Sequence, residues 1–192
     1  VRFDRTAPNT TTNIPAGGAY TSNPSVVFTI NDDASGGWTT YFTIDGTTPD
    51  FTSSSGSQVT FHTSGTYTIK FFSLDMAGNV ESVKTQTLKL DLEIPVISNF
   101  DPPDGVVSDT TTQISFDISD ALSGVDISSI ILDVDGIEYS RYKNTSYFHY
   151  IGTPASYTVT IYPIQDVLNF EDIQKLTLKN VKDFAGNEAS II

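Results

Sequence analysis

The chain of 192 residues contains no cysteine. Neither a disulfide framework nor a thiolate metal site is available to it, so its domains have to be held together by packing and hydrogen bonds. Basic residues are also scarce, because 10 Lys and Arg stand against 23 Asp and Glu and the net charge is −13. A charge of this sign repels nucleic acid and anionic lipid headgroups, and we expect neither as a partner.

Long apolar runs and catalytic motifs are missing as well. No stretch of 18 apolar residues occurs, and no charged and then apolar leader begins at Val1. We therefore expect no membrane insertion by these residues, and we place any export signal or anchor outside them. The two histidines, His62 and His149, do not lie beside a Gly-x-Ser-x-Gly nucleophile motif. Because phosphate-loop, zinc-pair and dinucleotide motifs are absent too, the sequence predicts a protein that is not an enzyme.

What the sequence does contain is the composition and periodicity of β-strands. It has 12 Phe and 9 Tyr to fill cores, together with many Thr, Val and Ile, which favour extended backbone. Alternation of apolar and polar residues predicts strands near residues 27–29, 41–43, 59–61, 67–71, 83–90, 114–118, 130–134, 147–151, 157–161 and 176–181. Only residues 167–175 have a short helical pattern. Strands of this number and spacing are typical of β-sandwiches, so the predicted fold class is all-β.

An internal repeat is the most informative feature of the chain. An acid stands four residues before a proline in residues 3–8 and again in residues 90–95, which marks two linkers. The motif Asp-x-Ala-Gly-Asn occurs at residues 75–79 and again at residues 183–187, where it is typical of a hairpin turn. Recurrence of both marks in the same order predicts one structural plan used twice.

A third acidic mark falls between the linker and the hairpin in each copy. Asp32 follows the first linker at nearly the same distance as Asp120 follows the second. We therefore expect two tandem immunoglobulin-like β-sandwiches, residues 1–90 and residues 91–192, the second with an insertion among its middle strands.

These motifs resemble the bacterial and archaeal immunoglobulin-like repeats of cell-surface proteins, whose modules begin with an Asp-x-x-x-Pro linker and end on an Asp-x-Ala-Gly-Asn hairpin. Residues 41–49, Tyr-Phe-Thr-Ile-Asp-Gly-Thr-Thr-Pro, with Gly-Thr-Tyr-Thr-Ile-Lys at 65–70, are also similar to the immunoglobulin-like C-terminal module of chitobiase-type glycoside hydrolases. The resemblance implies a β-sandwich and an extracellular or cell-surface location. It names no single function, because this fold serves adhesins, sugar binders, filament subunits and surface-layer proteins.

Two aromatic residues are candidates for fixed positions in such a sandwich. Trp38 is placed like the buried tryptophan of the third strand, and Tyr67 like the tyrosine whose hydroxyl closes a corner before the penultimate strand. Ordinary core packing explains each of them equally well.

The acidic residues are the candidate binding residues. Residues 1–90 carry five Lys and Arg against seven Asp and Glu, and residues 91–192 carry five against 16, so most of the negative charge belongs to the second half. In an immunoglobulin-like sandwich the chain entry, the loop after the second strand and the last hairpin lie at one end, so the three acidic marks converge. The larger predicted set, at the junction of the modules, is Asp91, Glu93, Asp120, Asp126, Asp183 and Asn187, and the second, weaker set is Asp4, Asp32, Asp33, Asp75 and Asn79.

Calcium prefers six to eight oxygen ligands from carboxylates, carbonyls and water, and both sets supply them. A cation there would stiffen the joint between modules. The alternative is that each Asp only accepts hydrogen bonds from the backbone of its own turn.

Two functional hypotheses follow, and both stay open. The first is a structural or adhesive spacer of an extracellular protein, such as a stalk, adhesin or surface layer, with neighbouring modules, a surface protein or a glycan as partners. The alternative is a carbohydrate-binding accessory module of a secreted glycoside hydrolase, in which a group of aromatic residues of the second half stacks on sugar rings; that group is Tyr139, Tyr142, Tyr147, Phe148 and Tyr150. An isopeptide bond from Lys70 or Lys179 to an Asn or Asp, as in some cell-wall adhesins, is a further option that sequence cannot locate.

Overall fold

The computed structural model describes residues 3–15, 18–20, 22–103, 113–162 and 176–189. The chain forms two compact units, Val1–Asp91 (unit 1) and Leu92–Ile192 (unit 2). Every regular element in the described ranges is a β-strand, which confirms the all-β fold class. The helical pattern at residues 167–175 lies outside the described residues.

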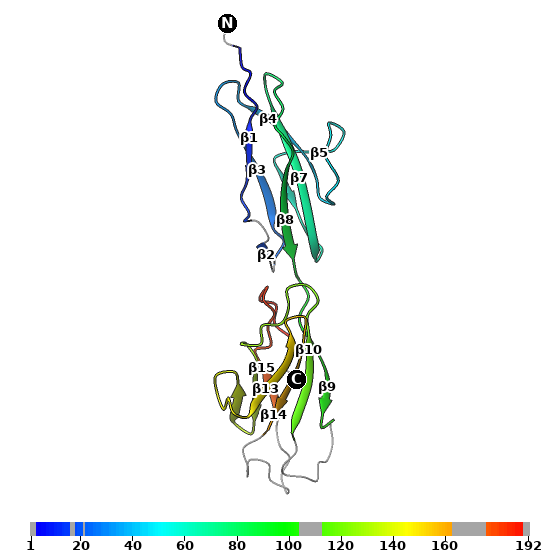
Figure 1. Ribbon diagram of the computed structural model, residues 1–192, viewed down its shortest axis with the longest axis vertical. Helices are drawn as coiled ribbons and strands as arrows, with labels where there is room; N and C mark the ends of the chain where they lie inside the picture. The colour runs from blue at the N-terminus through cyan, green and yellow to red at the C-terminus, as the bar shows by residue number, and fades with distance from the viewer. Residues whose placement is uncertain (1–2, 16–17, 21, 104–112, 163–175, 190–192) are drawn as a thin grey trace. The chain divides into compact units, whose positions relative to one another are not determined.

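Unit 1 is a sandwich of two sheets (Figure 1). Its strands are β1 (Asn9–Thr12), β2 (Gly18–Tyr20), β3 (Ser25–Asn31), β4 (Gly37–Thr43), β5 (Ser54–Ser55), β6 (Gln58–Thr60), β7 (Gly65–Asp75) and β8 (Lys84–Leu90). One sheet has the order β1-β3-β6 and the other the order β2-β8-β7-β4-β5. The chain therefore begins in one sheet at β1 and crosses to the other at β2, which pairs with β8 in parallel.

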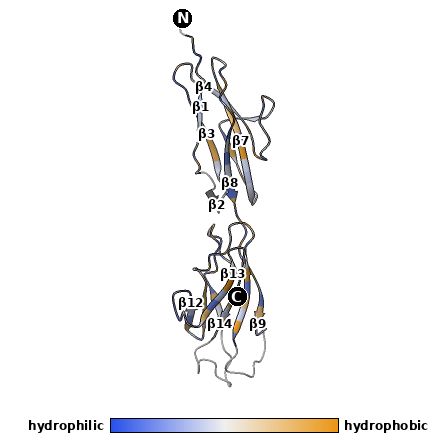
Figure 2. Cartoon of the chain, viewed as in Figure 1, coloured by the Kyte–Doolittle hydropathy of each residue, from blue (hydrophilic) through white to orange (hydrophobic). Residues whose placement is uncertain are grey.

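The core of unit 1 comes from the inward-facing residues of these strands. β3 has the alternating burial expected of a sandwich strand, with Val26 and Phe28 buried, and hydrophobic residues follow β3 and β7 (Figure 2). The Phe28 ring lies 5.2 Å from that of Phe42 and 5.1 Å from that of Phe71, so side chains of β3, β4 and β7 meet across the sandwich. Aromatic contacts of this kind add about 0.5–1.5 kcal/mol each beyond their buried area.

A polar network lies between the two sheets of unit 1. The Glu81 carboxylate is buried and accepts hydrogen bonds from the backbone N–H of Thr10 and of Ser73, both at 2.9 Å. The Ser73 hydroxyl lies 2.6 Å from that of Thr10 and 2.7 Å from that of Thr40. Because buried polar groups are tolerated only when they are hydrogen-bonded, this network fixes where β1 lies against β7.

Unit 2 is also a sandwich. Its described strands are β9 (Val96–Asp101), β10 (Ile114–Ser119), β11 (Ile131–Val134), β12 (Ile137–Ser140), β13 (Phe148–Thr153), β14 (Ser156–Ile161) and β15 (Leu176–Lys179). They form one sheet with the order β13-β14-β10-β9 and another with the order β12-β11-β15. The core side chains with no exposed surface include Phe116, Leu132 and Val159. The strands predicted from alternation in both halves are confirmed.

Trp38 is not a core residue, and the prediction that it is buried was wrong. Its side chain is 67% exposed. The register between β4 and β7 shifts between Gly37 and Thr39, so a β-bulge falls at Trp38. A bulge re-aims one side chain of a strand, and here it turns the ring away from the core.

Tyr67 does form a tyrosine corner. It lies near the start of β7, and its hydroxyl donates a hydrogen bond to the carbonyl oxygen of Thr63 at 2.6 Å. This contact ties the strand to the loop that precedes it. None of the described residues forms a helix suited to crossing a membrane.

Candidate functional site

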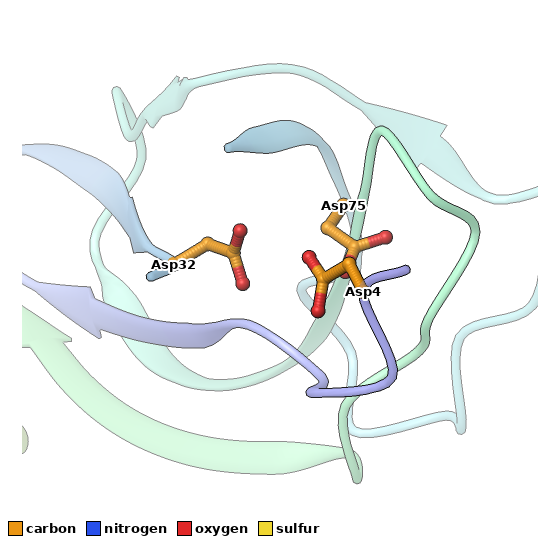
Figure 3. A group of neighbouring side chains, drawn as sticks. All are labelled: Asp4, Asp32 and Asp75. Carbon is orange, nitrogen blue, oxygen red and sulfur yellow. The ribbon is translucent and has the colours of Figure 1, made fainter. Parts of the chain in front are cut away.

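In unit 1 the structure brings three acidic side chains together. Asp4 lies before β1, Asp32 follows β3 and Asp75 is the last residue of β7. Their carboxylates each place an oxygen within 4.8 Å of the others. Figure 3 shows the carboxylate of Asp32 directed toward those of Asp4 and Asp75. Three separate segments therefore meet at one end of unit 1, and we call this group the unit 1 triad.

Asp32 caps its own loop but has one oxygen left over. Its Oδ2 accepts hydrogen bonds from the backbone N–H of Ala34, Ser35 and Gly36 at 3.2, 2.9 and 2.7 Å. Its Oδ1 is buried and has no hydrogen-bond partner. A buried polar atom without a partner carries a desolvation cost, which a bound cation would offset.

Asp75 is held by its own hairpin and is fully buried. Its Oδ1 accepts from the backbone N–H of Ala77 and Asn79, and its Oδ2 accepts from the Asn79 side-chain amide at 2.7 Å. Burial raises the pKa of Asp75, but the hydrogen bonds from Asn79 and Ala77 outweigh this and hold the pKa below its ordinary value. Asp4 acts in the opposite direction, because its negative charge raises the pKa of Asp75.

Asp4 completes the unit 1 triad from the linker. Its Oδ1 accepts from the backbone N–H of Thr6 at 3.0 Å, and its Oδ2 accepts from that of Ser35 at 2.9 Å. The Oδ1 atom thus caps the entry segment itself, and the Oδ2 atom fixes that segment against the loop that Asp32 caps. An open hollow beside the triad is lined by Asp4, Ala34, Ser35, Met76 and Ala77.

The same arrangement occurs a second time with Asp91, Asp120 and Asp183, which we call the second triad. An oxygen of each lies within 4.8 Å of the others, and all three side chains are buried. The Asp120 Oδ1 accepts from the backbone N–H of Gly124 at 2.6 Å. The Asp183 Oδ2 accepts from the Asn187 amide at 2.8 Å, as Asp75 does from Asn79.

Other residues of the predicted sets lie apart from the two triads. Glu93 and Asp33 are exposed, and neither belongs to an acidic group of the described residues. Asp126 uses its Oδ1 to cap a turn, accepting from the backbone N–H and hydroxyl of Ser128 at 3.0 and 2.6 Å. Asn79 and Asn187 direct their side-chain N–H groups, not their oxygens, at the carboxylates. Each predicted set therefore reduces to one aspartate from the linker, one from the loop and one from the hairpin.

These carboxylates can cap a turn and bind a cation at the same time. Most oxygens already accept backbone hydrogen bonds, which is the turn-capping role. Two oxygens that each contact a calcium ion at about 2.4 Å are at most about 4.8 Å apart, and one oxygen from each aspartate of a triad meets this condition.

Residues 15–85 match the family of chitobiase/beta-hexosaminidase C-terminal domains. This match lies within unit 1 and confirms the resemblance found in residues 41–49 and 65–70. A comparison with curated protein sequences found no match.

Two solved structures are similar to the chain over nearly its whole length. One is that of the fibronectin(III)-like modules of Clostridium thermocellum CbhA, with a TM-score of 0.41 and 14% identity over 96% of this chain and 90% of that chain. The other is the D00-D0 domain of intimin, with a TM-score of 0.42 and 10% identity over 96% of this chain and 98% of that chain.

The aromatic residues predicted as a sugar platform in unit 2 differ in exposure, and Tyr147 is 38% exposed. Tyr139 and Phe148 are core residues, with 0% and 5% of their surface exposed. Tyr150 packs edge-on against Tyr157 of the adjacent strand, with ring centroids 5.7 Å apart. Tyr142, at 72% exposed, is the member of the group with the most free surface.

Of the two lysines considered for a crosslink, Lys70 lies on β7 and Lys179 on β15. Lys179 donates to Asp133 at 2.7 Å, and this ion pair raises the pKa of Lys179. Lys84 was not singled out from sequence, yet it contacts Glu81 at 2.8 Å and Asn9 at 2.6 Å. Sequence gives little indication that Lys84, Glu81 and Asn9 meet, because Asn9 lies at the start of β1 and the other two residues lie near the end of unit 1.

Proposed function

We propose that this chain is a non-catalytic spacer from an extracellular or cell-surface protein, built of two immunoglobulin-like units, and that each of its two aspartate triads binds calcium. The observation that carries the proposal is the construction of the same linker, loop and hairpin triad twice in one chain. Hairpin capping needs only Asp75 or Asp183. The linker and loop aspartates cap other backbone groups, and turn capping alone does not require them to lie within 4.8 Å of the hairpin aspartate in both triads.

Electrostatics supports a cation as the ligand of each triad. Carboxylates at this distance repel one another when all are ionised, and the negative charge of Asp4 accordingly raises the pKa of Asp75, although the hydrogen bonds to Asp75 hold that pKa below its ordinary value. A divalent cation bound between the carboxylates attracts each of them, and this attraction replaces their mutual repulsion. In the unit 1 triad the unpartnered Oδ1 of Asp32 is the oxygen best suited to be a ligand.

The second triad links calcium to the spacer role. Asp91 belongs to the segment that joins the two units in sequence. A cation held by Asp91, Asp120 and Asp183 would therefore restrain that segment. A spacer whose joining segment is restrained is stiffer along its chain than one whose joining segment is flexible.

The test is the melting temperature of the chain with and without calcium. Mass action stabilises a folded state that alone binds the ion, by about 2.7 kcal/mol at a free calcium concentration of 100 times the Kd. For units of this size we expect a rise of several degrees, and its loss with EDTA. Calorimetric titration should give two ions per chain.

Two substitutions locate the effect. Asp32→Asn keeps the size of the side chain but removes its charge, and we expect it to abolish the calcium response of unit 1 while that of unit 2 remains. Asp45→Asn is the matched control, because Asp45 also caps a turn, accepting from Thr47 at 3.0 and 2.6 Å, but lies outside both triads. If the chain melted at the same temperature in calcium and in EDTA, the triads would not be calcium sites and would act only as turn caps.

Carbohydrate binding is a second candidate function, and the exposure of Trp38 favours it. The family match spans this residue, and the family is named for glycoside hydrolases. A tryptophan with two thirds of its surface free is the kind of flat apolar face on which sugar rings stack. Tyr142 offers a similar face in unit 2.

The matching experiment is a pull-down with insoluble polysaccharides, chitin among them. Saturable binding that falls at least tenfold in Trp38→Ala or Tyr142→Ala supports this second function. Phe51→Ala is the control, because Phe51 is 60% exposed but already packs edge-on against Tyr41 and Phe72. If the unmodified chain does not bind, or if Phe51→Ala loses as much binding as Trp38→Ala and Tyr142→Ala, carbohydrate binding through these residues is contradicted.

A further inference from the structure

Lys84 occupies an unusual position at the edge of the polar network of unit 1. Its Nζ lies 2.6 Å from the side-chain oxygen of Asn9, 2.7 Å from the carbonyl oxygen of Thr10 and 2.8 Å from Oε2 of Glu81. Asn9 is the first residue of β1 and Lys84 the first residue of β8. An amine, a carboxamide and a carboxylate thus meet between strands of opposite sheets.

Glu81 is the buried member of this group. Its side chain is 4% exposed, whereas that of Lys84 is 31% exposed. The backbone N–H groups of Thr10 and Ser73 hold the carboxylate in place. A fixed acid in contact with an amine that itself contacts a carboxamide is suited to proton transfer during aminolysis.

Lys179 provides an internal comparison. It has similar exposure, 34%, and also meets an acid, Asp133, at 2.7 Å. Its second acid, Glu138, is 3.6 Å away and is already paired with Lys143 at 2.5 Å. Both acids lie on β11 and β12 of the same sheet as Lys179, so this group is an ordinary cross-strand ion pair in which the amine contacts carboxylates.

We propose that Lys84 and Asn9 become joined by an isopeptide bond, with Glu81 as the residue that moves the protons. The bond would connect Nζ of Lys84 to Cγ of Asn9. It would link the first and last strands of the unit and release one molecule of ammonia.

The reaction balances with the groups present. The Lys84 ammonium gives one proton to the Glu81 carboxylate, and the neutral amine attacks Cγ of Asn9, so that a C–N bond forms and the carbonyl electron pair moves to the oxygen. Glu81 gives its proton to the Asn9 nitrogen and takes one from the attacking nitrogen. The carbonyl then re-forms as the bond from Cγ to Nδ2 breaks. The departing ammonia takes the proton from Glu81 and leaves as ammonium.

Proximity is the source of the rate. Amide aminolysis is slow between separate molecules, but groups held in contact behave as if present at about 10⁵–10⁸ M. Asn9 is exposed, so the ammonium can leave directly into solvent.

The consequence is mechanical. Force applied to the ends of unit 1 would enter before Asn9 and leave after Lys84. The bond would therefore carry the force, and residues 10–83 would stay folded under it.

The experiment is the intact mass of the full chain, followed by peptide mapping. We expect a mass lower than that of the sequence by one ammonia, and a linked peptide pair that contains Asn9 and Lys84. Lys84→Arg and, independently, Glu81→Gln should restore the full sequence mass. Lys179→Arg, the matched control, should keep the ammonia deficit.

The unmodified chain alone decides the outcome, so the test does not depend on the variants folding. A full sequence mass without a linked peptide overturns the proposal, as does an ammonia deficit that maps to another site. If the linked peptide still formed in Glu81→Gln, Glu81 would not be the residue that moves the protons.

Discussion

Replacing Glu81 with Gln should lower the free energy of unfolding of unit 1 by about 2–4 kcal/mol. The carboxylate accepts two backbone N–H groups and an ammonium at the same time. A glutamine has one acceptor oxygen, so its NH₂ group would face a donor where the carboxylate had offered an acceptor. A buried backbone N–H would then be left without a partner.

Glu188 is the control for this change. It also follows an Asp-x-Ala-Gly-Asn motif, one position nearer to it than Glu81 does, but it is 44% exposed and meets Lys182 at 3.5 Å. Glu188→Gln should therefore change the stability of unit 2 by less than about 0.5 kcal/mol. Hydrogen exchange measured by mass spectrometry assigns a free energy to the peptides of each unit separately. Equal effects of the two substitutions would show that burial of Glu81 contributes nothing.

The repeat and the strands were predictable because they depend on local sequence. Alternation of apolar and polar residues fixes which face of a strand is buried, and Asp-x-Ala-Gly-Asn encodes its own hairpin. Asp4, Asp32 and Asp75 could be named for the same reason: each stands at a fixed point of a repeated motif. Their meeting then follows from the order of strands in the sandwich.

The errors arise where the structure depends on pairing between distant segments. Trp38 is exposed because β4 has a bulge against β7, and no local pattern announces a bulge. Glu93 and Asp126 match the acidic composition of the predicted set, yet one faces solvent and the other caps its own turn. Glu81 was visible only as one more acid after a hairpin, because its partners come from β1 and β7.

A second large loss of stability is expected in unit 2. Phe116→Ala should lower the free energy of unfolding of this unit by about 3–5 kcal/mol. Phe116 has no exposed surface, stacks on Phe100 with centroids 5.2 Å apart and lies opposite Val159 in the register of β10 and β14. Removing the ring leaves a cavity among β-branched neighbours, which have little rotamer freedom with which to fill it.

Phe184→Ala removes the same number of atoms from the same unit and separates burial from side-chain size. Phe184 is 59% exposed in the hairpin that presents Asp183, so its loss should cost less than about 1 kcal/mol. Hydrogen exchange in urea should show early opening of unit 2 peptides in Phe116→Ala, with those of unit 1 unchanged. If unit 1 peptides opened at the same urea concentration, the two units would form one cooperative body, and the stability of each could no longer be assigned to its own core.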